Sequence, residues 1–324
     1  MKSKSKIELS LSTISGLTEY HLGTPTQAVE ELDDGWFNTI YRATLSDGRD
    51  VVLKMAPPPG FQVMRYDRNI LASEVAVLDL LGKTDGVPVP AVLAYDDSRS
   101  LHPHDFFLME YIPGTPYNKL HESLAAEERE PYDFQLGRIC ARIHSITGER
   151  FGRYQEDHCA TTSWQESFPA MIEDLLLDAD DTGVELPVSA ESIREACRTA
   201  QYELAEVTEP HLVAWDLHPG NVFVDNGSIR AIIDCDRALW GDPLMEYPFR
   251  TIDWKRVGFH KGYASDTLLS QPGAERRIWL YDLYHALVVV VECGFRGYEG
   301  SHIDWARNEF ARVMSIARPG WLSR

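Results

Sequence analysis

The sequence predicts an α+β protein of two lobes, with an antiparallel β-sheet in the N-terminal lobe and mainly helices in the C-terminal lobe. Strand-like alternation and short apolar runs dominate before residue 112, and helical spacing dominates after it. Between them, the segment 112–117, IPGTPY, interrupts the pattern with two prolines and a glycine. We therefore expect two domains, residues 1–112 and 113–324.

The N-terminal part is predicted to hold about five antiparallel strands and one helix. Residues 27–32, 38–45 and 50–55 alternate or run apolar between Gly and Asp punctuation, which indicates a β-meander. Residues 68–81 follow with apolar positions three and four apart, which favours a helix. Two more short strands are expected at 91–95 and 106–111.

The C-terminal part is predicted to be helical around an island of β-hairpin. Helical spacing occurs in residues 132–146, 164–177 and 192–207, and again in 276–295 and 302–317. The hairpin is expected between 212 and 236, where Asn226-Gly227 is the dipeptide best suited to a two-residue turn.

Composition excludes several classes of protein. Fifty Asp and Glu residues outnumber 31 Lys and Arg residues, so the formal charge is −19 and a nucleic-acid partner is not expected. The N-terminus lacks the apolar core of a signal peptide, and the longest apolar stretch, 286–295, is short and contains Glu292. We expect a cytoplasmic protein, a monomer or homodimer, with no membrane partner.

The cysteines indicate neither a disulfide framework nor a structural zinc site. The five thiols are widely spaced and form no C-x-x-C pair: Cys140, Cys159, Cys197, Cys235 and Cys293. Reduced and mostly buried thiols are expected.

Three polar residues surround the predicted hairpin. Asp216 and Asn221 precede the strand VFV, and Asp234 ends the returning strand AIID. Asp and Asn are ordinary turn residues that hydrogen-bond their own backbone, so a structural role would explain them. Convergence of three oxygen-bearing side chains would instead suit Mg²⁺ bound together with substrate phosphates.

The N-terminal part offers a cation for such a site. Lys54 ends the third strand, and Glu74 lies in the helix that follows. A lysine at a strand end is most often only solvated. A strand lysine followed by a helix glutamate is also the pair with which protein-kinase-like enzymes hold the α- and β-phosphates of a nucleotide.

Taken together, these motifs resemble the aminoglycoside phosphotransferase family, which includes relatives of choline kinase and shares the protein-kinase-like fold. The matching segments occur in the family's order over roughly residues 29–247: VVLK, ASEVAVLDLL, FLMEYIPG, LGRICARIHSI, DLHPGNVFV and IIDCDRALWGDPLME. The last 75 or so residues fit only as helices.

The resemblance implies a role for each matching residue. Asp216 would accept or orient the proton of the substrate hydroxyl, while Asn221 and Asp234 would bind Mg²⁺. Lys54 would contact the α- and β-phosphates of ATP or GTP, and Glu74 would hold that lysine.

Nucleotide contacts are implied at two further segments. The backbone of the inter-lobe segment would bind the adenine, and the turn 35–41 would cover the phosphates. The residues concerned are Glu110, Tyr111, Ile112, Asn38 and Thr39.

The chain also departs from the family pattern. Ala214-Trp215-Asp216 stands where the family usually has His-Gly-Asp, so the histidine that braces the catalytic loop is missing. The tryptophan would either pack that loop or narrow the acceptor pocket. Glu246, in place of a usual Asp, is a candidate for fixing the loop, and Asp236 and Asp242 are either functional residues or structural caps.

The remaining polar candidates favour structural roles. His218 is predicted to be packed in its turn, and His144 to be a core residue.

The predicted function is transfer of the γ-phosphoryl group of ATP (or GTP), with Mg²⁺, to a hydroxyl of a small molecule. The acceptor would be an aminoglycoside-like antibiotic or an amino-alcohol or sugar metabolite. A non-catalytic nucleotide-binding pseudokinase is the alternative. The net charge favours a cationic acceptor over an anionic one, with four candidate carboxylates in the C-terminal lobe: Glu166, Glu173, Asp174 and Glu246.

Overall fold

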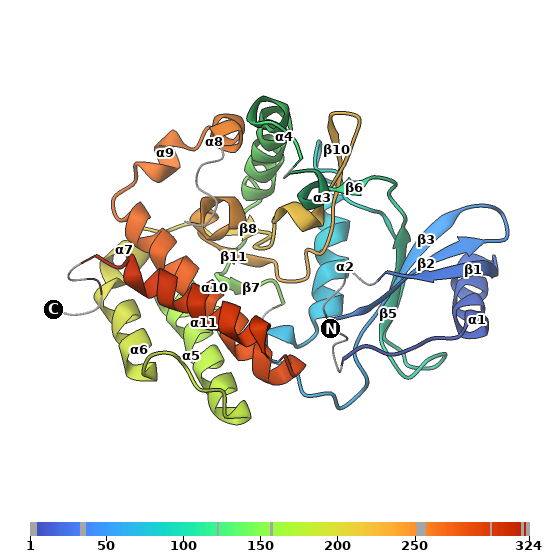
Figure 1. Ribbon diagram of the computed structural model, residues 1–324, viewed down its shortest axis with the longest axis horizontal. Coiled ribbons are helices and arrows are strands. Elements are labelled where there is room, and N and C mark those ends of the chain that lie inside the picture. Colours follow the sequence, from blue (N-terminus) through green and yellow to red (C-terminus); the bar gives the residue numbers. More distant parts are fainter. Residues whose placement is uncertain are drawn as a thin grey trace.

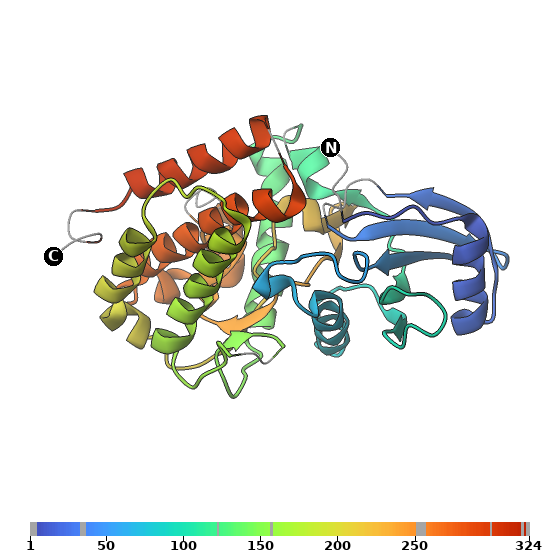
Figure 2. The ribbon, with the colours of Figure 1, turned by 90° about the horizontal axis from the view of Figure 1, so that it is seen from below.

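The computed structural model describes residues 5–32, 37–121, 123–155, 158–250, 257–298, 300–318 and 321. A β-sheet lobe and a helical lobe lie at opposite ends of an elongated molecule, as Figures 1 and 2 show. This arrangement confirms the predicted α+β fold with an antiparallel N-terminal sheet.

The N-terminal sheet has five strands in the order β1-β2-β3-β5-β4, and every pair of neighbours is antiparallel. The strands are β1 (Thr26–Glu31), β2 (Thr39–Leu45), β3 (Asp50–Met55), β4 (Val92–Asp96) and β5 (Phe106–Glu110). All five predicted strands are present, because their apolar alternation matches a sheet that is buried on both faces.

A helix covers each face of this sheet (Figure 1). α1 (Leu11–Leu22) packs Ile14 and Leu17 against one face, and α2 (Ile70–Leu81) packs Leu71 and Leu78 against the other. The sequence analysis predicted α2 and missed α1. Ser10 accepts a hydrogen bond from the backbone N–H of Thr13 and so caps α1, a start signal that could have revealed it.

Helices dominate the C-terminal lobe. The long ones are α4 (Ala126–His144), α5 (Trp164–Thr182), α10 (Ala274–Arg296) and α11 (Ser301–Ser315). Shorter ones are α3 (Tyr117–His121), α6 (Ala190–Thr199), α7 (Gln201–Ala205), α8 (Val257–Tyr263) and α9 (Asp266–Leu269). The predicted single helix 192–207 is divided into α6 and α7, because Ala200 leaves the helical region with φ −102° and ψ 13°.

The apolar stretch in α10 forms part of the core. Among the described helices, α10 alone is long and apolar enough to cross a membrane, but 78% of its apolar window is buried inside the protein. Its valines and leucines pack with α5 and with the strands of the lobe. Residues 286–293 of the apolar stretch are therefore buried in the protein core.

Short strands and turns connect the C-terminal lobe to the cleft. β6 (Thr115–Pro116) joins the hairpin of β9 (Val222–Asp225) and β10 (Ser228–Ile232), and β7 (Gly152–Arg153), β11 (Leu239–Gly241) and β8 (His211–Val213) form another small sheet. The predicted Asn226-Gly227 turn is present, with φ +45° and +81°. The described residues of this part also form the 3₁₀ turns η2 (Pro219–Asn221), η3 (Pro243–Met245) and η4 (Tyr247–Phe249), while η1 (Arg65–Asp67) lies between β3 and α2 in the N-terminal lobe.

All five cysteines are buried and free. The prediction of reduced, buried thiols is thus confirmed for the described chain.

Close packing of α4 on α8 depends on glycine. A Cβ atom on Gly137 would lie 2.2 Å from the carbonyl oxygen of Phe259. We therefore expect Gly137→Ala to lower the free energy of unfolding by about 1–3 kcal/mol, because backbone rather than a mobile side chain must move. Urea denaturation measures this change.

Gly16→Ala is the matched control. Gly16 is on the exposed side of α1, and nothing lies within 4 Å of the added Cβ atom. It should raise stability by about 0.5–1 kcal/mol, as alanine is the better helix former. Equal stability of the Gly137→Ala and wild-type proteins would contradict the close approach of α4 and α8.

Candidate active site

Strand alternation in β3 directs Lys54 toward the cleft. Val51 and Leu53 pack toward α1, whereas Val52 packs toward α2, and Lys54 shares the face of Val52. The Lys54 Nζ atom lies 2.6 Å from Glu74 Oε2 and 2.5 Å from Asp234 Oδ1. The structure therefore brings together a lysine, a glutamate and an aspartate that are far apart in the sequence.

Charge in this cluster is unbalanced. Lys54 is almost completely buried, and Asp236 Oδ2 is also only 3.8 Å from its Nζ atom, so one cation faces three carboxyl groups. Burial raises the pKa of Glu74 to about 7, although Lys54 acts in the opposite direction. Burial would also raise the pKa of Asp234, but the charge and hydrogen bond of Lys54 together with the charges of Arg237 and His218 outweigh it, so that pKa lies below its ordinary value. Burial and the charge of Asp234 raise the pKa of Asp236 well above its ordinary value, so either a proton or a second cation would reduce the negative charge of this cluster.

Backbone pairing brings Asn221 beside Asp234. The N–H of Ile233 donates to the carbonyl of Asn221 at 3.0 Å, which extends the ladder of β9 and β10 by one step. The Asn221 amide Nδ2 donates to the backbone carbonyl of Asp216, also at 3.0 Å. This bond leaves the amide oxygen Oδ1 as an acceptor for a cation. Asn221 therefore lies beside Asp234 across the hairpin, and the backbone of Asp216 adjoins the Asn221 side chain.

Two residues brace the loop that carries Asp216. Glu246 is fully buried and accepts the N–H groups of Trp215 at 3.1 Å and Leu217 at 3.4 Å. Arg250 Nη2 donates to the Trp215 carbonyl at 2.6 Å. Glu246 therefore holds the loop as the sequence suggested. Arg250 was not anticipated, and no motif in the sequence marks it.

Trp215 occupies a position that favours glycine. Its φ of +70° is in the left-handed region, which costs a residue with a Cβ about 1–2 kcal/mol. Its ring is 4.4 Å from the Arg250 guanidinium and makes an edge contact with Tyr284. The tryptophan also lines a cavity, so it both packs the loop and narrows that cavity.

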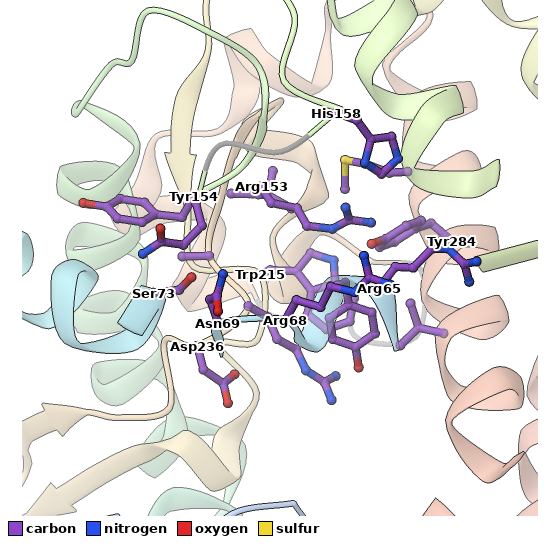
Figure 3. Close-up of a pocket in the computed structure, with 17 residues that line it drawn as sticks. Arg65, Arg68, Asn69, Ser73, Arg153, Tyr154, His158, Trp215, Asp236 and Tyr284 are labelled. Carbon is purple, nitrogen blue, oxygen red and sulfur yellow. The ribbon is translucent and has the colours of Figure 1, made fainter. Parts of the chain in front are cut away.

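That cavity has a volume of about 160 Å³ and lies where the two lobes meet. Figure 3 shows its labelled side chains: Arg65, Arg68, Asn69 and Ser73 from the N-terminal lobe, and Arg153, Tyr154, His158, Trp215, Asp236 and Tyr284 from the C-terminal lobe. Its position beside the Asp216 loop makes it the candidate acceptor site.

The carboxylates expected to attract a cationic acceptor lie elsewhere. Glu173 forms a bidentate pair with Arg194, Asp174 pairs with Arg153, and Glu246 is occupied by the loop backbone. Glu166 is exposed in the first turn of α5. None of these four described residues lines the cavity. Sequence position alone placed them near the acceptor, because it could not show which face of each element they occupy.

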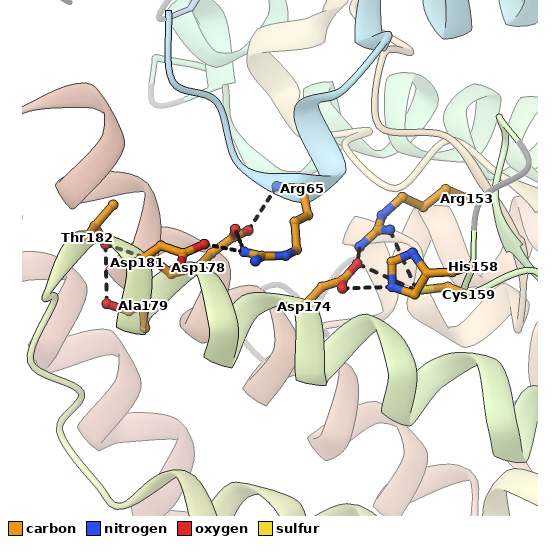
Figure 4. Close-up of polar contacts among 9 residues, drawn as sticks. All are labelled: Arg65, Arg153, His158, Cys159, Asp174, Asp178, Ala179, Asp181 and Thr182. Carbon is orange, nitrogen blue, oxygen red and sulfur yellow. Dashed lines mark hydrogen bonds and ion pairs between the residues drawn. The ribbon is translucent and has the colours of Figure 1, made fainter.

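An ion pair missed by the sequence analysis joins the two lobes. Arg65, in η1, contacts Asp178 of α5 and lies 2.8 Å from Asp181 (Figure 4). The backbone N–H of Arg65 also donates to Asp178 Oδ2 at 2.9 Å. The neighbouring Tyr66 hydroxyl donates to Glu292 of α10. The segment that connects β3 to α2 is therefore fastened to the C-terminal lobe.

The predicted nucleotide contacts lie along the N-terminal side of the cleft. Asn38 is buried and its Oδ1 atom has no hydrogen-bond partner among the described residues. The Thr39 hydroxyl accepts the backbone N–H of Ile7 at 2.9 Å and donates to the Ile7 carbonyl at 3.4 Å, so donation to a phosphate would replace the second of these bonds. Gly35 and Trp36 of the predicted phosphate-covering turn lie outside the described residues.

The inter-lobe segment follows β5 directly. Glu110 is exposed and is the last residue of β5, and Tyr111 and Ile112 continue the chain toward β6. The Arg42 guanidinium lies 4.3 Å from the centre of the Tyr111 ring. Binding of adenine by this backbone stays a prediction.

The other polar candidates have structural partners. His218 Nδ1 accepts the N–H of Gly220, and His144 is buried with its Nδ1 atom 2.9 Å from the Tyr263 hydroxyl. Asp242 caps η3 and accepts from Arg277 at 2.7 Å. These residues stabilise the fold of the lobe, whereas Asp236 lines the cavity.

Comparison with known proteins identifies the class. The sequence pattern of the phosphotransferase enzyme family matches residues 28–254, well over half of the chain. The chain therefore belongs to that family, which confirms the resemblance drawn from its motifs.

Solved structures share the fold at low sequence identity. A candidate fructosamine-3-kinase from Thermobifida fusca has a TM-score of 0.69 and 21% identity, with 95% of this chain and 100% of that chain covered. The aminoglycoside phosphotransferase APH(4)-Ia, solved with AMP-PNP and hygromycin B, has a TM-score of 0.67 and 19% identity, with coverages of 94% and 98%. These likenesses establish the fold.

Curated relatives match over shorter segments. Altered inheritance of mitochondria protein 9 from Debaryomyces hansenii is 31% identical over 153 residues, which cover 44% of this chain and 24% of that protein. Acyl-CoA dehydrogenase family member 10 from Mus musculus is 29% identical over 134 residues, or 41% of this chain and 12% of that protein. The chain thus spans about a quarter or less of the length of these two relatives.

The loop brace can be tested by removing Glu246. In Glu246→Ala, three backbone N–H groups, those of Trp215, Leu217 and Tyr247, lose their acceptor in a buried site, so stability should fall by about 2–4 kcal/mol. Glu246→Gln retains one acceptor oxygen and should lose less. Thermal and urea unfolding report both changes.

Glu166→Ala is a control for loss of a carboxylate, because Glu166 is exposed. It should change stability by no more than about 0.5 kcal/mol. If Glu246→Ala were equally mild, the bonds from Glu246 to the loop would not stabilise the protein.

Proposed function

We propose that the protein transfers the γ-phosphoryl group of ATP (or GTP) to a hydroxyl group of a small molecule, with Mg²⁺ as cofactor. One observation carries this proposal: Lys54 is held by Glu74 and Asp234, and Asp234 adjoins the loop that presents Asp216 and Asn221. A phosphate-binding cation, donors for a metal and a base for a hydroxyl therefore meet in one cleft.

The metal donors are suitable for Mg²⁺. The ion prefers oxygen ligands, and Asp234 offers a carboxylate kept ionised by Lys54, while Asn221 offers its amide oxygen. When bound, Mg²⁺ would neutralise charge on the nucleotide phosphates. Asp234 has φ of +60°, and backbone strain of this kind is common where function demands a special geometry.

The protein groups would act mainly by positioning. Glu74 would keep Lys54 in place while its ammonium group binds phosphate oxygens. The Asp216 carboxylate would orient the acceptor hydroxyl and take its proton as phosphoryl transfer proceeds. Glu246 and Arg250 would support this step by fixing the loop on both sides of Trp215. No covalent enzyme intermediate is needed.

The acceptor is proposed to occupy the cavity beside Trp215. Support for a small-molecule acceptor comes from structural neighbours solved with such compounds, including a streptomycin–ATP complex of APH(2")-IIa. A pseudokinase remains the alternative, because the usual histidine is absent. An active enzyme is favoured because the chain retains Lys54, Asp216, Asn221 and Asp234. In addition, Glu246 and Arg250 brace the loop in place of the missing histidine.

Asp216→Asn tests the proposed base. The variant should fold and bind Mg·ATP nearly as wild type does, but its turnover should fall by roughly 10²-fold or more, as expected when a positioned base is lost. The assay is ADP release stimulated by a panel of hydroxyl-bearing compounds. Asp225→Asn is the control, because Asp225 is exposed at the end of β9, and this variant should keep wild-type turnover. Wild-type-like turnover of Asp216→Asn would refute the assignment.

Asp234→Ala tests the proposed metal site. Removal of this carboxylate should weaken Mg²⁺-dependent nucleotide binding by about tenfold or more, a loss near 1.4 kcal/mol. Calorimetry with AMP-PNP, with and without Mg²⁺, separates the metal effect from the direct contacts of Lys54. An unchanged affinity for Mg·AMP-PNP would show that the metal is held elsewhere.

A further inference from the structure

The acceptor cavity is lined by basic side chains. Four arginines reach it from three separate parts of the chain: Arg65 and Arg68 near η1, Arg153 from β7, and Arg237 after β10. In Figure 3, Arg65, Arg68 and Arg153 are drawn around Trp215. Asp236 is the one acidic residue among the described residues that line it.

The carboxylates that pair with these arginines lie behind them. Arg65 contacts Asp178 and Arg153 contacts Asp174, and both carboxylates are only 2–3% exposed (Figure 4). Arg237 contacts Glu292 of α10, which does not line the cavity. A guanidinium group has five N–H donors, and Arg65 shares its donors between Asp178 and Asp181. Apart from Asp236, the described residues that line the cavity present arginine N–H groups and no carboxylate oxygens.

Arg68 adds a charge without a counter-ion. It is exposed at the rim, and it forms no ion pair with any residue in the part of the chain that the structure describes. Arg65 and Arg153 are balanced by buried carboxylates, but Arg68 is not. Among the described residues that line the cavity, four arginines and one aspartate therefore leave an excess of positive charge.

Positive charges also act on a histidine that lies beside Trp215. The His285 ring lies 5.7 Å from that of Trp215. Burial, together with the charges of Arg250 and Arg237, lowers the pKa of His285 well below its ordinary value. The charges of Arg250 and Arg237 thus act on this histidine in the direction that keeps its ring neutral.

We propose that the acceptor carries an anionic group, a carboxylate or a phosphate, which lies among Arg65, Arg68 and Arg153. This inference rests on the proposed function, since it assigns the substrate class of the same site. Arginine forks suit both anions because they donate paired, charge-assisted hydrogen bonds. The sign is opposite to that expected from the net charge of −19.

The cavity also limits the size of the acceptor. Its volume of about 160 Å³ is below the range of roughly 300–1,000 Å³ typical of sites for drug-sized ligands. A small hydroxy acid, sugar acid or sugar phosphate fits this volume better than a compound of several rings. The hydroxyl group of the acceptor would lie toward Asp216, the residue that follows Trp215 in the chain.

The test compares four probes of one carbon skeleton: glucose, gluconate, glucose 6-phosphate and glucosamine. Calorimetry is carried out on the protein saturated with Mg·AMP-PNP, so that the anions cannot occupy the phosphate positions of the nucleotide. Gluconate or glucose 6-phosphate should bind at least about tenfold more tightly than glucose and glucosamine. Which of the two binds better distinguishes a carboxylate from a phosphate.

Arg68→Gln identifies the side chain responsible. It should weaken binding of the preferred anion by about tenfold, and Arg68→Lys should weaken it less, because the charge remains but the fork is lost. Arg49→Gln changes the net charge equally in the exposed turn before β3, and should leave anion affinity unchanged.

Some contrary results would refute the inferred anionic acceptor, and another would refute the proposed function. If both anions bind no better than glucose, or if glucosamine binds best, the inference is wrong. It is also wrong if Arg68→Gln and Arg49→Gln have the same effect on anion affinity. Failure of the wild-type protein to bind Mg·AMP-PNP would instead refute the proposed function, so the two failures are distinguishable.

Discussion

Burial of the Lys54 ammonium group is the constraint on which the rest of the structure depends. A charge in the protein interior is tolerated only when it is paired and hydrogen-bonded, and removal of one partner typically costs about 3–5 kcal/mol. Lys54 comes from β3, Glu74 from α2 and Asp234 from the end of the hairpin. Satisfying one cation therefore fixes the N-terminal sheet, its helix and the C-terminal lobe relative to one another.

A second set of ionic and hydrogen-bonding contacts joins the two lobes on the other side of the cleft. Arg65 and Tyr66, in η1, contact α5 and α10 respectively. The connection between β3 and α2 is therefore anchored to two helices of the C-terminal lobe. The same contacts bring arginines of the N-terminal lobe to a cavity formed largely by the C-terminal lobe. Lobe closure and the character of the acceptor site are consequently linked, because one segment serves both.

The loop of Asp216 shows how a missing family residue can be replaced. Ala214 cannot supply the hydrogen bonds of a histidine, but Glu246 accepts two backbone N–H groups and Arg250 donates to the carbonyl between them. The Trp215 ring stacks near Arg250 and so adds packing to this network. Buried polar groups that are satisfied in this way hold a strained backbone in one conformation.

The sequence by itself determined most of the elements and most of the candidate catalytic cluster. Two-residue alternation in β3 placed Lys54 on the face of α2, and the Asn226-Gly227 turn set the hairpin that joins Asn221 to Asp234. These features follow from local rules of backbone and side-chain direction. Only the tertiary structure decided what surrounds the acceptor, because that depends on pairs such as Arg65 with Asp178, which are 113 positions apart. A net charge of −19 sums over the whole surface, whereas the cavity is lined by arginines whose carboxylate partners are buried behind them.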